Sequence, residues 1–428
     1  MNETPDKIGK YVVSELVGRG GSGLVYKAFD PFVRREVAVK IALHLSEEPR
    51  HLGGSNSLTN NFFTEARAAG MLYHAHIVAL YDAGMQDDLC YIVMEFIDGD
   101  TLLPWCQPDG PRMPLADVLE LIGKCARGLD YSHSHGVLHR DIKPSNIMIT
   151  SHGVPKIMDF SIAEINEHRL EDDTTAVGSP LYMSPEQVSR LPLGPPSDLY
   201  ALGAVMYELL TGEPPFTAPH LHGLFAAIRN QPAPLLSAKR PDIASDICNI
   251  VTKLLSKKPA ERYPSGRALA EALAHQLERL RQSDVQAARR GQRDALRSLT
   301  FFNAFSELEV DDLLSAAQLK SYAPGALILD AEEIDSAFFL LVRGQALVKK
   351  GDKPIHVLNK DDCFGEMGLA ANGTRSASVS AATQVVALKL SASALGKLAP
   401  DRQLLFYKTF TQTLIQRLTG SRLPPAGP

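Results

Sequence analysis

Hydrophobic and polar residues follow different patterns in the two halves of the chain. Near the N-terminus, strand-like apolar runs (YVVSELV, LVYKAF and EVAVKIAL) are separated by glycine or charged turns. Longer runs with helical spacing follow, such as LADVLELIGKCARGLDYSH and SDLYALGAVMYELLTG. Towards the C-terminus, short β-type runs (ALIL, FFLLV, ALVKK, IHVL, ASVSA and QVVALKL) recur about every ten residues, which is typical of a small β-barrel or jelly roll.

A helical stretch separates the two patterns. Its apolar stripe at Leu269, Leu273, Leu277 and Leu280 has helical spacing and continues into a polar, basic stretch without proline. We therefore predict a first domain over residues 1–275, a basic linker helix over 276–299, a β-rich domain over 300–420 and a flexible tail over 421–428.

Composition narrows the class of protein. The 428 residues are 45% hydrophobic and 22% charged with a net charge of −5, which is globular and excludes a disordered chain. No apolar run approaches the roughly 18 residues of a membrane span, and the N-terminus lacks the apolar core of a signal peptide. The five cysteines include no C-x-x-C pair, so neither disulfides nor zinc are indicated. We expect a cytoplasmic protein with no nucleic-acid partner.

The first motif with chemical content is a glycine-rich turn between two predicted strands. Gly18, Gly20 and Gly23, followed by Val25, form a G-x-G-x-x-G-x-V pattern, in which backbone amides can approach phosphates closely. An ordinary glycine-rich hairpin looks the same. A Rossmann fingerprint is the other alternative, although a strand follows the glycines where that fold needs a helix.

Companion motifs favour the nucleotide interpretation. Val37-Ala38-Val39-Lys40 places a lysine in a buried strand, where it can reach nucleotide phosphates. Because a buried ammonium without a partner is costly, we expect Lys40 to pair with Glu65 in the helical run FFTEARAAGML.

The run His139-Arg140-Asp141-Ile142-Lys143-Pro144-Ser145-Asn146 and the later Asp159-Phe160-Ser161 supply phosphoryl-transfer chemistry. Asp141 can orient a substrate hydroxyl and accept its proton, and Lys143 can steady the transferred phosphate. Asn146 and Asp159 carry hard oxygen ligands that suit Mg²⁺.

In the order and spacing of these motifs the sequence resembles the protein Ser/Thr kinase family over about residues 8–275, and Lys143 is typical of the Ser/Thr form. The resemblance implies that Asp198 braces the catalytic loop and that Arg262 pairs with Glu186. It also implies an ATP site made by Val17, Gly18, Gly20, Gly23, Val25, Ala38, Lys40, Glu65 and the hinge residues Glu95 and Ile97.

Two departures and one regulatory feature accompany the resemblance. Ser161 replaces the glycine of Asp-Phe-Gly, and Ala69 stands where the family has a larger apolar residue, so the hydrophobic column between the lobes is expected to be thinner.

Arg140, beside Asp141, is expected to pair with an anion, which phosphorylation of the following segment would supply. Thr174 and Thr175 are the candidate phosphorylation sites. Alternatively, the acidic residues before them already supply that charge.

The second domain carries its own ligand motif. A glycine turn, a glutamate and an arginine nine residues later can hold phosphate and a ribose hydroxyl. The run resembles the phosphate-binding cassette of cyclic-nucleotide-binding domains. The implied ligand residues are Gly365, Glu366, Met367, Gly368, Arg375, Ser376 and Ala377. The alternative is that Glu366 and Arg375 merely bridge each other.

The sequence thus predicts a multidomain α+β protein, with a bilobal protein-kinase fold followed by a jelly-roll-like cyclic-nucleotide-binding β-roll with flanking helices. The expected activity is transfer of the ATP γ-phosphoryl group to protein hydroxyls with ATP and Mg²⁺, regulated by a cyclic nucleotide, with cAMP favoured over cGMP. A weakly active kinase-fold scaffold and a kinase with a ligand-free docking roll remain alternatives, as does self-association. The linker arginines Arg289, Arg290 and Arg293 either dock in the substrate groove or form a solvated helix face.

Overall fold

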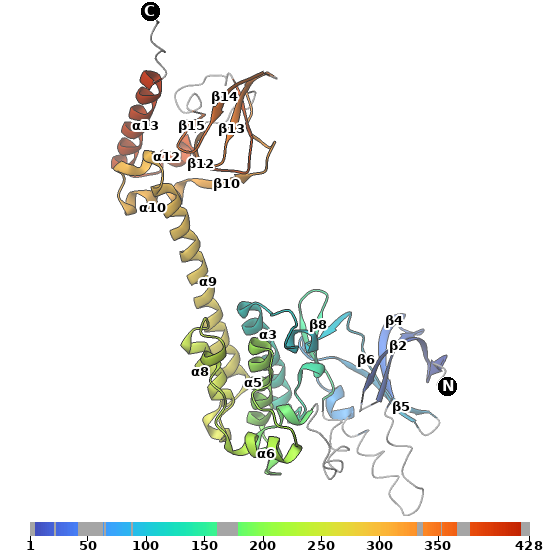
Figure 1. The fold of residues 1–428 in the computed structure, drawn as a ribbon. Helices are drawn as coiled ribbons and strands as arrows, with labels where there is room; N and C mark the ends of the chain where they lie inside the picture. The colour runs from blue at the N-terminus through green and yellow to red at the C-terminus, as the bar shows by residue number, and fades with distance from the viewer. Residues whose placement is uncertain are drawn as a thin grey trace, which may run out of the picture. The chain divides into compact units, whose positions relative to one another are not determined.

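The computed structural model describes residues 5–20, 23–41, 63, 66–86, 89–160, 179–331, 337–351, 353–365 and 377–420 (Figure 1). The chain divides into two compact units, Met1–Leu280 and Arg281–Pro428. The division falls within helix α9 (Gly266–Arg297), which covers residues 276–297 of the linker helix that the sequence predicts over 276–299.

The N-terminal unit begins with a six-stranded antiparallel sheet in the order β1-β2-β3-β4-β6-β5. Strand alternation gives the sheet two different faces. In β4, Val37 and Val39 pack in the core on one face, while Ala38 packs with Ile92 and Met94 on the other. Lys40 therefore lies on the face of Ala38. The strands are β1 (Lys7–Ile8), β2 (Tyr11–Gly20), β3 (Gly23–Asp30), β4 (Arg35–Ile41), β5 (Leu80–Gln86) and β6 (Leu89–Glu95).

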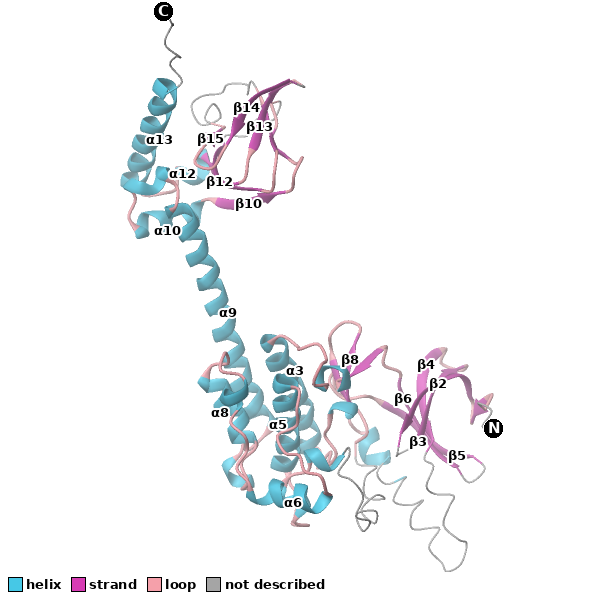
Figure 2. Ribbon diagram, in the orientation of Figure 1, coloured by secondary structure: helices cyan, strands magenta, loops and turns pink. Residues whose placement is uncertain are grey.

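A largely helical part follows and contains the main core of this unit (Figure 2). Helix α5 (Pro195–Thr211) is buried over nearly all its length, in keeping with the mainly apolar run from Leu199 to Leu210. It ends at Gly212, whose φ of 83° suits the left-handed cap that favours glycine. The other helices are α2 (Leu103–Cys106), α3 (Leu115–Ser134), α4 (Pro185–Val188), α6 (Leu221–Asn230), α7 (Leu236–Lys239) and α8 (Ser245–Leu254).

A small three-stranded sheet lies beside these helices and carries the predicted catalytic segment. Its order is β7 (Gly99–Thr101), β8 (Ile147–Thr150) and β9 (Pro155–Ile157). A single 3₁₀ turn, Pro144–Asn146, leads directly into β8. The motif residues thus come just before one strand and just after another.

The C-terminal unit confirms the predicted β-roll. Two four-stranded sheets, β10-β17-β12-β15 and β11-β16-β13-β14, enclose one core. The first sheet packs its other face on helices through a second core rich in phenylalanine. The strands are β10 (Gln318–Tyr322), β11 (Leu327–Leu329), β12 (Ala337–Arg343), β13 (Ala346–Lys350), β14 (Lys353–Leu358), β15 (Cys363–Phe364), β16 (Ser378–Ala381) and β17 (Val385–Ser391), and the helices are α10 (Glu307–Ala316), α12 (Ala392–Leu395) and α13 (Pro400–Gly420).

Two of the three linker arginines have partners inside the C-terminal unit. Arg289 donates from Nη2 to Ser315 Oγ over 2.6 Å, and Arg293 Nη1 lies 3.2 Å from Asp311 Oδ2. These contacts fasten the last turns of α9 to α10.

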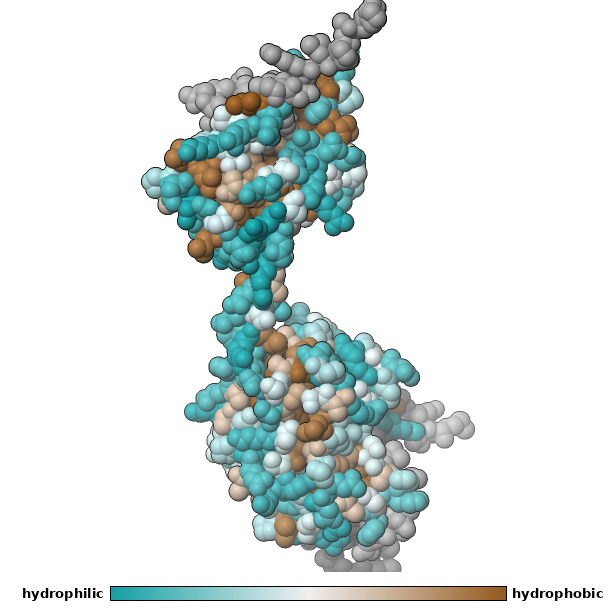
Figure 3. All heavy atoms as spheres, turned by 60° about the vertical axis from the view of Figure 1, so that its left-hand side comes forward, coloured by the Kyte–Doolittle hydropathy of each residue, from teal (hydrophilic) through white to brown (hydrophobic). Residues whose placement is uncertain are grey.

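Whether a described helix could cross a membrane depends on its length and apolar character. None of them is long and apolar enough to cross a bilayer. Figure 3 shows hydrophilic and hydrophobic side chains intermixed over the visible face of each unit.

Candidate active site

Three predicted catalytic side chains meet on the segment before β8. Lys143 Nζ donates to Asp141 Oδ2 over 2.6 Å. Asn146 donates from Nδ2 to the Asp141 backbone oxygen over 2.8 Å and to Asp141 Oδ2 over 3.1 Å. Asn146 is buried, while Asp141 and Lys143 are partly exposed. The carboxylate is thus held in one orientation at the surface of the site.

Buried Asp198, at the start of α5, fixes the backbone of this segment. It accepts hydrogen bonds from the backbone N–H groups of His139 over 2.9 Å and Arg140 over 2.8 Å, and its Oδ2 lies 2.7 Å from His133 Nε2. Arg140 has a φ of 66°, a conformation that costs energy for a non-glycine residue, so these bonds hold a strained backbone. Burial alone would raise the pKa of Asp198, but its hydrogen bonds, first that with His133, lower the pKa below its ordinary value.

The predicted buried lysine faces the predicted metal ligand. Lys40 Nζ lies 2.8 Å from Asp159 Oδ1, and only 5% of Lys40 is exposed. Asp159 lies two residues after the end of β9 and has a φ of 62°, so the chain turns sharply at this residue. Glu65, the partner expected from the sequence, lies outside the described residues, and so does Ser161.

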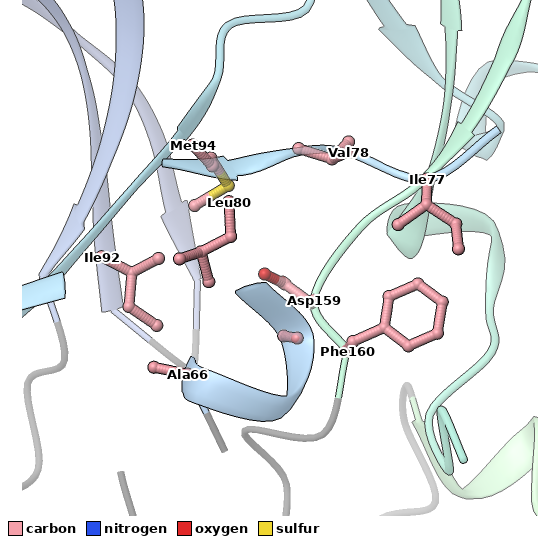
Figure 4. Close-up of a pocket in the computed structure, with 9 residues that line it drawn as sticks. Ala66, Ile77, Val78, Leu80, Ile92, Met94, Asp159 and Phe160 are labelled. Atoms are coloured by element: carbon pink, nitrogen blue, oxygen red, sulfur yellow. The ribbon is translucent and has the colours of Figure 1, made fainter. Parts of the chain in front are cut away.

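A small apolar pocket lies behind this ion pair (Figure 4). Among the described lining residues Asp159 is the one with a charge, and Phe160 lies beside Ile77. Ala69, noted in the sequence as smaller than its family counterpart, is one of the lining residues. The described residues that line the pocket are Ala66, Ala69, Ile77, Val78, Leu80, Ile92, Met94, Asp159 and Phe160.

The predicted hinge has a contact that sequence reasoning missed. The Glu95 carboxylate accepts two bonds of 2.8 Å from Lys156 Nζ in β9, and it also accepts from the Ala79 backbone N–H over 3.2 Å. Ile97 is buried. Lys156 has no signal in the sequence, since its partner lies 61 positions away.

The glycine-rich turn lies at the end of the β2–β3 hairpin. Gly18 is paired in register with Val25, and Gly20 with Gly23. Val17 is exposed, and Val25 is half-buried on the sheet face that carries Ala38. These residues lie on the same sheet as Lys40, as a phosphate-binding turn above that lysine requires.

A second buried ion pair lies away from the reacting groups. Arg262 donates to both Glu186 oxygens, over 2.6 and 2.8 Å. Ser197 donates to Glu186 Oε1 over 2.7 Å, a contact the sequence did not indicate. Burial acts to raise the pKa of Glu186, but the hydrogen bonds from Arg262 and Ser197 lower it overall.

Much of the ligand cassette lies outside the described residues, and so do the candidate phosphorylation sites Thr174 and Thr175. Of the cassette only Gly365 and Ala377 are described. Gly365 has a φ of 82°, and a Cβ there would come within 2.7 Å of the Ala337 backbone oxygen, so only glycine fits this turn. The predicted positions outside the described residues are Glu366, Met367, Gly368, Arg375 and Ser376.

Comparison with known proteins gives two family matches. Residues 11–277 match the protein kinase domain, and residues 319–401 match the cyclic nucleotide-binding domain. The chain is 37% identical over 263 residues to the serine/threonine-protein kinase PknB of Mycolicibacterium smegmatis, covering 59% of this chain and 41% of that protein. It is 36% identical over 258 residues to the serine/threonine-protein kinase PrkC of Bacillus subtilis, covering 60% of this chain and 38% of that protein.

A solved structure gives the same result for the N-terminal unit. A variant of the Mycobacterium tuberculosis PknI kinase domain aligns with a TM-score of 0.52 at 26% identity, covering 64% of this chain and 99% of that one. The chain spans about two fifths of the length of the curated relatives named above.

Proposed function

The chain belongs to the protein kinase family, and from that premise we propose that it is an ATP-dependent Ser/Thr protein kinase regulated by a cyclic nucleotide. The proposal is supported by two groups of contacts, the Lys40–Asp159 ion pair and the bonds that Lys143 and Asn146 make to Asp141. The backbone N–H of Met158, next to Asp159, donates to the backbone oxygen of Asn146 over 2.9 Å and so links the two groups. Its substrates are protein hydroxyls. The proposed division is a kinase domain over 1–275, a linker over 276–299 and a cyclic-nucleotide-binding domain over 300–420.

The donor set fits a magnesium nucleotide. Asn146 uses its amide nitrogen on Asp141, so its amide oxygen is left to accept, and Asp159 adds a carboxylate. These are hard oxygen ligands of the kind that Mg²⁺ binds. When bound, MgATP supplies the phosphoryl group and the metal charge that offsets its negative oxygens.

The chain's own residues then position the reaction. Lys40 holds phosphate oxygens from the sheet side, while the Asp141 carboxylate receives the proton of the substrate hydroxyl. The Lys143 ammonium, bonded to that carboxylate, puts positive charge beside the transferring group. Asp198 keeps the segment in the geometry that these steps need.

Substitution of the reacting groups tests the kinase proposal. Asp141→Asn removes the proton acceptor, and Lys40→Met or Asp159→Asn removes a phosphate or metal contact. We expect each to lower ³²P transfer to a protein substrate by about 10³-fold while the protein remains folded. Near wild-type autophosphorylation in Asp159→Asn would contradict an active kinase and favour a scaffold.

The proposed effector is a cyclic nucleotide bound by the Gly365–Ala377 cassette, with cAMP favoured over cGMP. The family match over 319–401 and the glycine-only turn at Gly365 support this assignment. The same ³²P measurement, with and without each nucleotide, separates the alternatives. A response to a nucleotide supports the sensor, and activity without any response or binding supports a docking roll.

A further inference from the structure

A hollow in the C-terminal unit lies between helix α9 and the sheet strands β10, β17 and β12. Its volume is about 630 Å³, within the roughly 300–1,000 Å³ of small-molecule sites. We call it the α9 groove. Its lining residues are Ala288, Gly291, Gln292, Ala295, Ser298, Leu319, Ser321, Val342, Arg343, Lys360 and Val386.

On the sheet side, the α9 groove is lined by the apolar side chains of Leu319, Val342 and Val386 and by one cationic residue, Arg343. Ser321 is the partner of Val386, and Val386 is the partner of Arg343, so the three lie in one row across the strands. The register shifts between Leu341 and Arg343. Such a bulge re-aims side chains, which explains how the consecutive Val342 and Arg343 both line the hollow.

The helix side of the α9 groove is lined by small residues, and at Gly291 no neighbouring atom requires one. Ala288, Gly291 and Ala295 share one face at helical spacing. A glycine inside a helix costs about 1 kcal/mol relative to alanine. A Cβ added at Gly291 would meet nothing within 4 Å, so no neighbour demands the glycine there. Because Gly291 has no side chain, the α9 groove is wider at this position.

Positive charge in the α9 groove has no acidic counterpart among the described lining residues. Within the described part of the chain, Arg343 makes no hydrogen bond or ion pair. Lys360 Nζ donates to the neutral Ser298 Oγ over 3.0 Å. The carboxylates next to Lys360 are engaged elsewhere, since Asp361 accepts from the Thr300 N–H and Asp362 from the Asn359 N–H.

We propose that the α9 groove binds an amphiphilic organic anion, a carboxylate or phosphate monoester on an apolar chain. The apolar body would lie on Leu319, Val342 and Val386, and the anionic group would meet the Arg343 fork and Lys360. This ligand would contact both helix α9 and the roll, and none of the described lining residues belongs to the predicted cyclic-nucleotide cassette.

The test uses the full chain and calorimetric titration with decanoate and decyl phosphate, which distinguish a carboxylate from a phosphate headgroup. Acetate and inorganic phosphate serve as probes of charge alone. We expect saturable binding of a ten-carbon anion to one site and no saturable binding of the short anions. The double variant Arg343→Gln/Lys360→Gln should bind at least about ten-fold more weakly, since it removes both charge-assisted contacts to the anionic group.

Matched variants localise the binding. Gly291→Leu projects a side chain into the α9 groove and should abolish binding, whereas Ala287→Leu, an exposed neighbour that does not line it, should not. Lys320→Gln is the charge control. Lys320 pairs in register with Ala387, which belongs to the inner core of the roll, so it lies on the opposite sheet face from Ser321.

Three results would overturn the proposal: no saturable binding of either ten-carbon anion, wild-type affinity in Gly291→Leu, or wild-type affinity in the double charge variant. A wild-type dimer that Gly291→Leu converts to a monomer, with no anion binding, would instead assign the α9 groove to a second copy of the chain. Thermal melting checks folding of each variant. If Gly291→Leu does not fold, the double charge variant decides.

Discussion

Among single residues, the buried pair of Glu186 and Arg262 has the largest predicted effect on stability. Both side chains are almost completely buried and joined by two hydrogen bonds. Removing one partner leaves the other as an uncompensated buried charge, which typically costs about 3–5 kcal/mol. We expect Arg262→Ala to lower the free energy of unfolding by that amount in urea titration.

An exposed pair provides the matched control for this prediction. Lys258 and Glu261 lie 3.0 Å apart, but their side chains are 79% and 53% exposed. Such pairs contribute about 0–1 kcal/mol. A loss in Lys258→Ala equal to that in Arg262→Ala would show that burial is not the cause.

We expect two buried carboxylates, those of Glu186 and Asp198, to make the stability of the protein depend on pH in acid. Hydrogen bonds lower the pKa of Glu186 and Asp198 below their ordinary values of 4.5 and 3.8. The folded state therefore binds fewer protons than the unfolded state in this range, so stability is fully present above the ordinary pKa and is lost as pH falls towards the folded pKa. We expect urea midpoints to fall on acidification below about pH 4.5, and Glu186→Gln to flatten that dependence. A profile equally steep in Glu186→Gln would contradict the assignment to Glu186.

The sequence predicts a contact between two residues when both belong to recognisable motifs. It does not predict a contact between residues that only the folded structure brings together. The Glu186–Arg262 pair was implied by family resemblance, and the structure has it. By contrast, Lys156 at Glu95, Ser197 at Glu186 and His133 at Asp198 are brought in by tertiary packing. Lys40 was expected to meet Glu65, and among described residues its partner is Asp159, because the chain turns sharply at Asp159.

Among the secondary-structure elements, periodicity was the reliable signal. The strand-like and β-type runs became the strands of the N-terminal sheet and the roll, and the leucine stripe became the buried side of α9. The partners of the basic end of α9 were not predictable, because they depend on where α10 packs. The expectation left two alternatives for the linker arginines, and the structure pairs Arg289 and Arg293 with α10.

The α9–α10 contact yields a prediction at this scale. Arg293→Ala removes ion pairs to Asp311 at 3.2 Å and Glu307 at 3.5 Å. Because these groups are partly exposed, we expect a loss of about 0.5–1 kcal/mol and faster amide hydrogen exchange in α10. Arg290→Ala is the control, since Arg290 is exposed and no contact of it is seen in the described part of the chain. Equal effects of the two variants would contradict the contact.

For the whole molecule, we propose that one chain combines a catalytic domain with a domain that senses a ligand. A ligand in the C-terminal domain can change kinase output only if it binds the active and inactive arrangements with different affinities. Coupling free energies of this kind are typically about 1–3 kcal/mol, which corresponds to changes of roughly 5- to 150-fold in affinity. If the cyclic nucleotide changes the affinity for ATP, linkage requires that ATP changes the affinity for the cyclic nucleotide by the same factor.

The most direct measurement of the central claim is ³²P transfer to a protein substrate by the full chain, with and without cAMP and cGMP, in wild type, Asp141→Asn and Arg375→Glu. The account predicts that a cyclic nucleotide changes the wild-type rate, that Asp141→Asn is inactive under all conditions, and that Arg375→Glu keeps basal activity but loses the response, because a repelling charge replaces the phosphate clamp. Retention of the full nucleotide response in Arg375→Glu, or a wild-type rate that neither nucleotide alters, would contradict it.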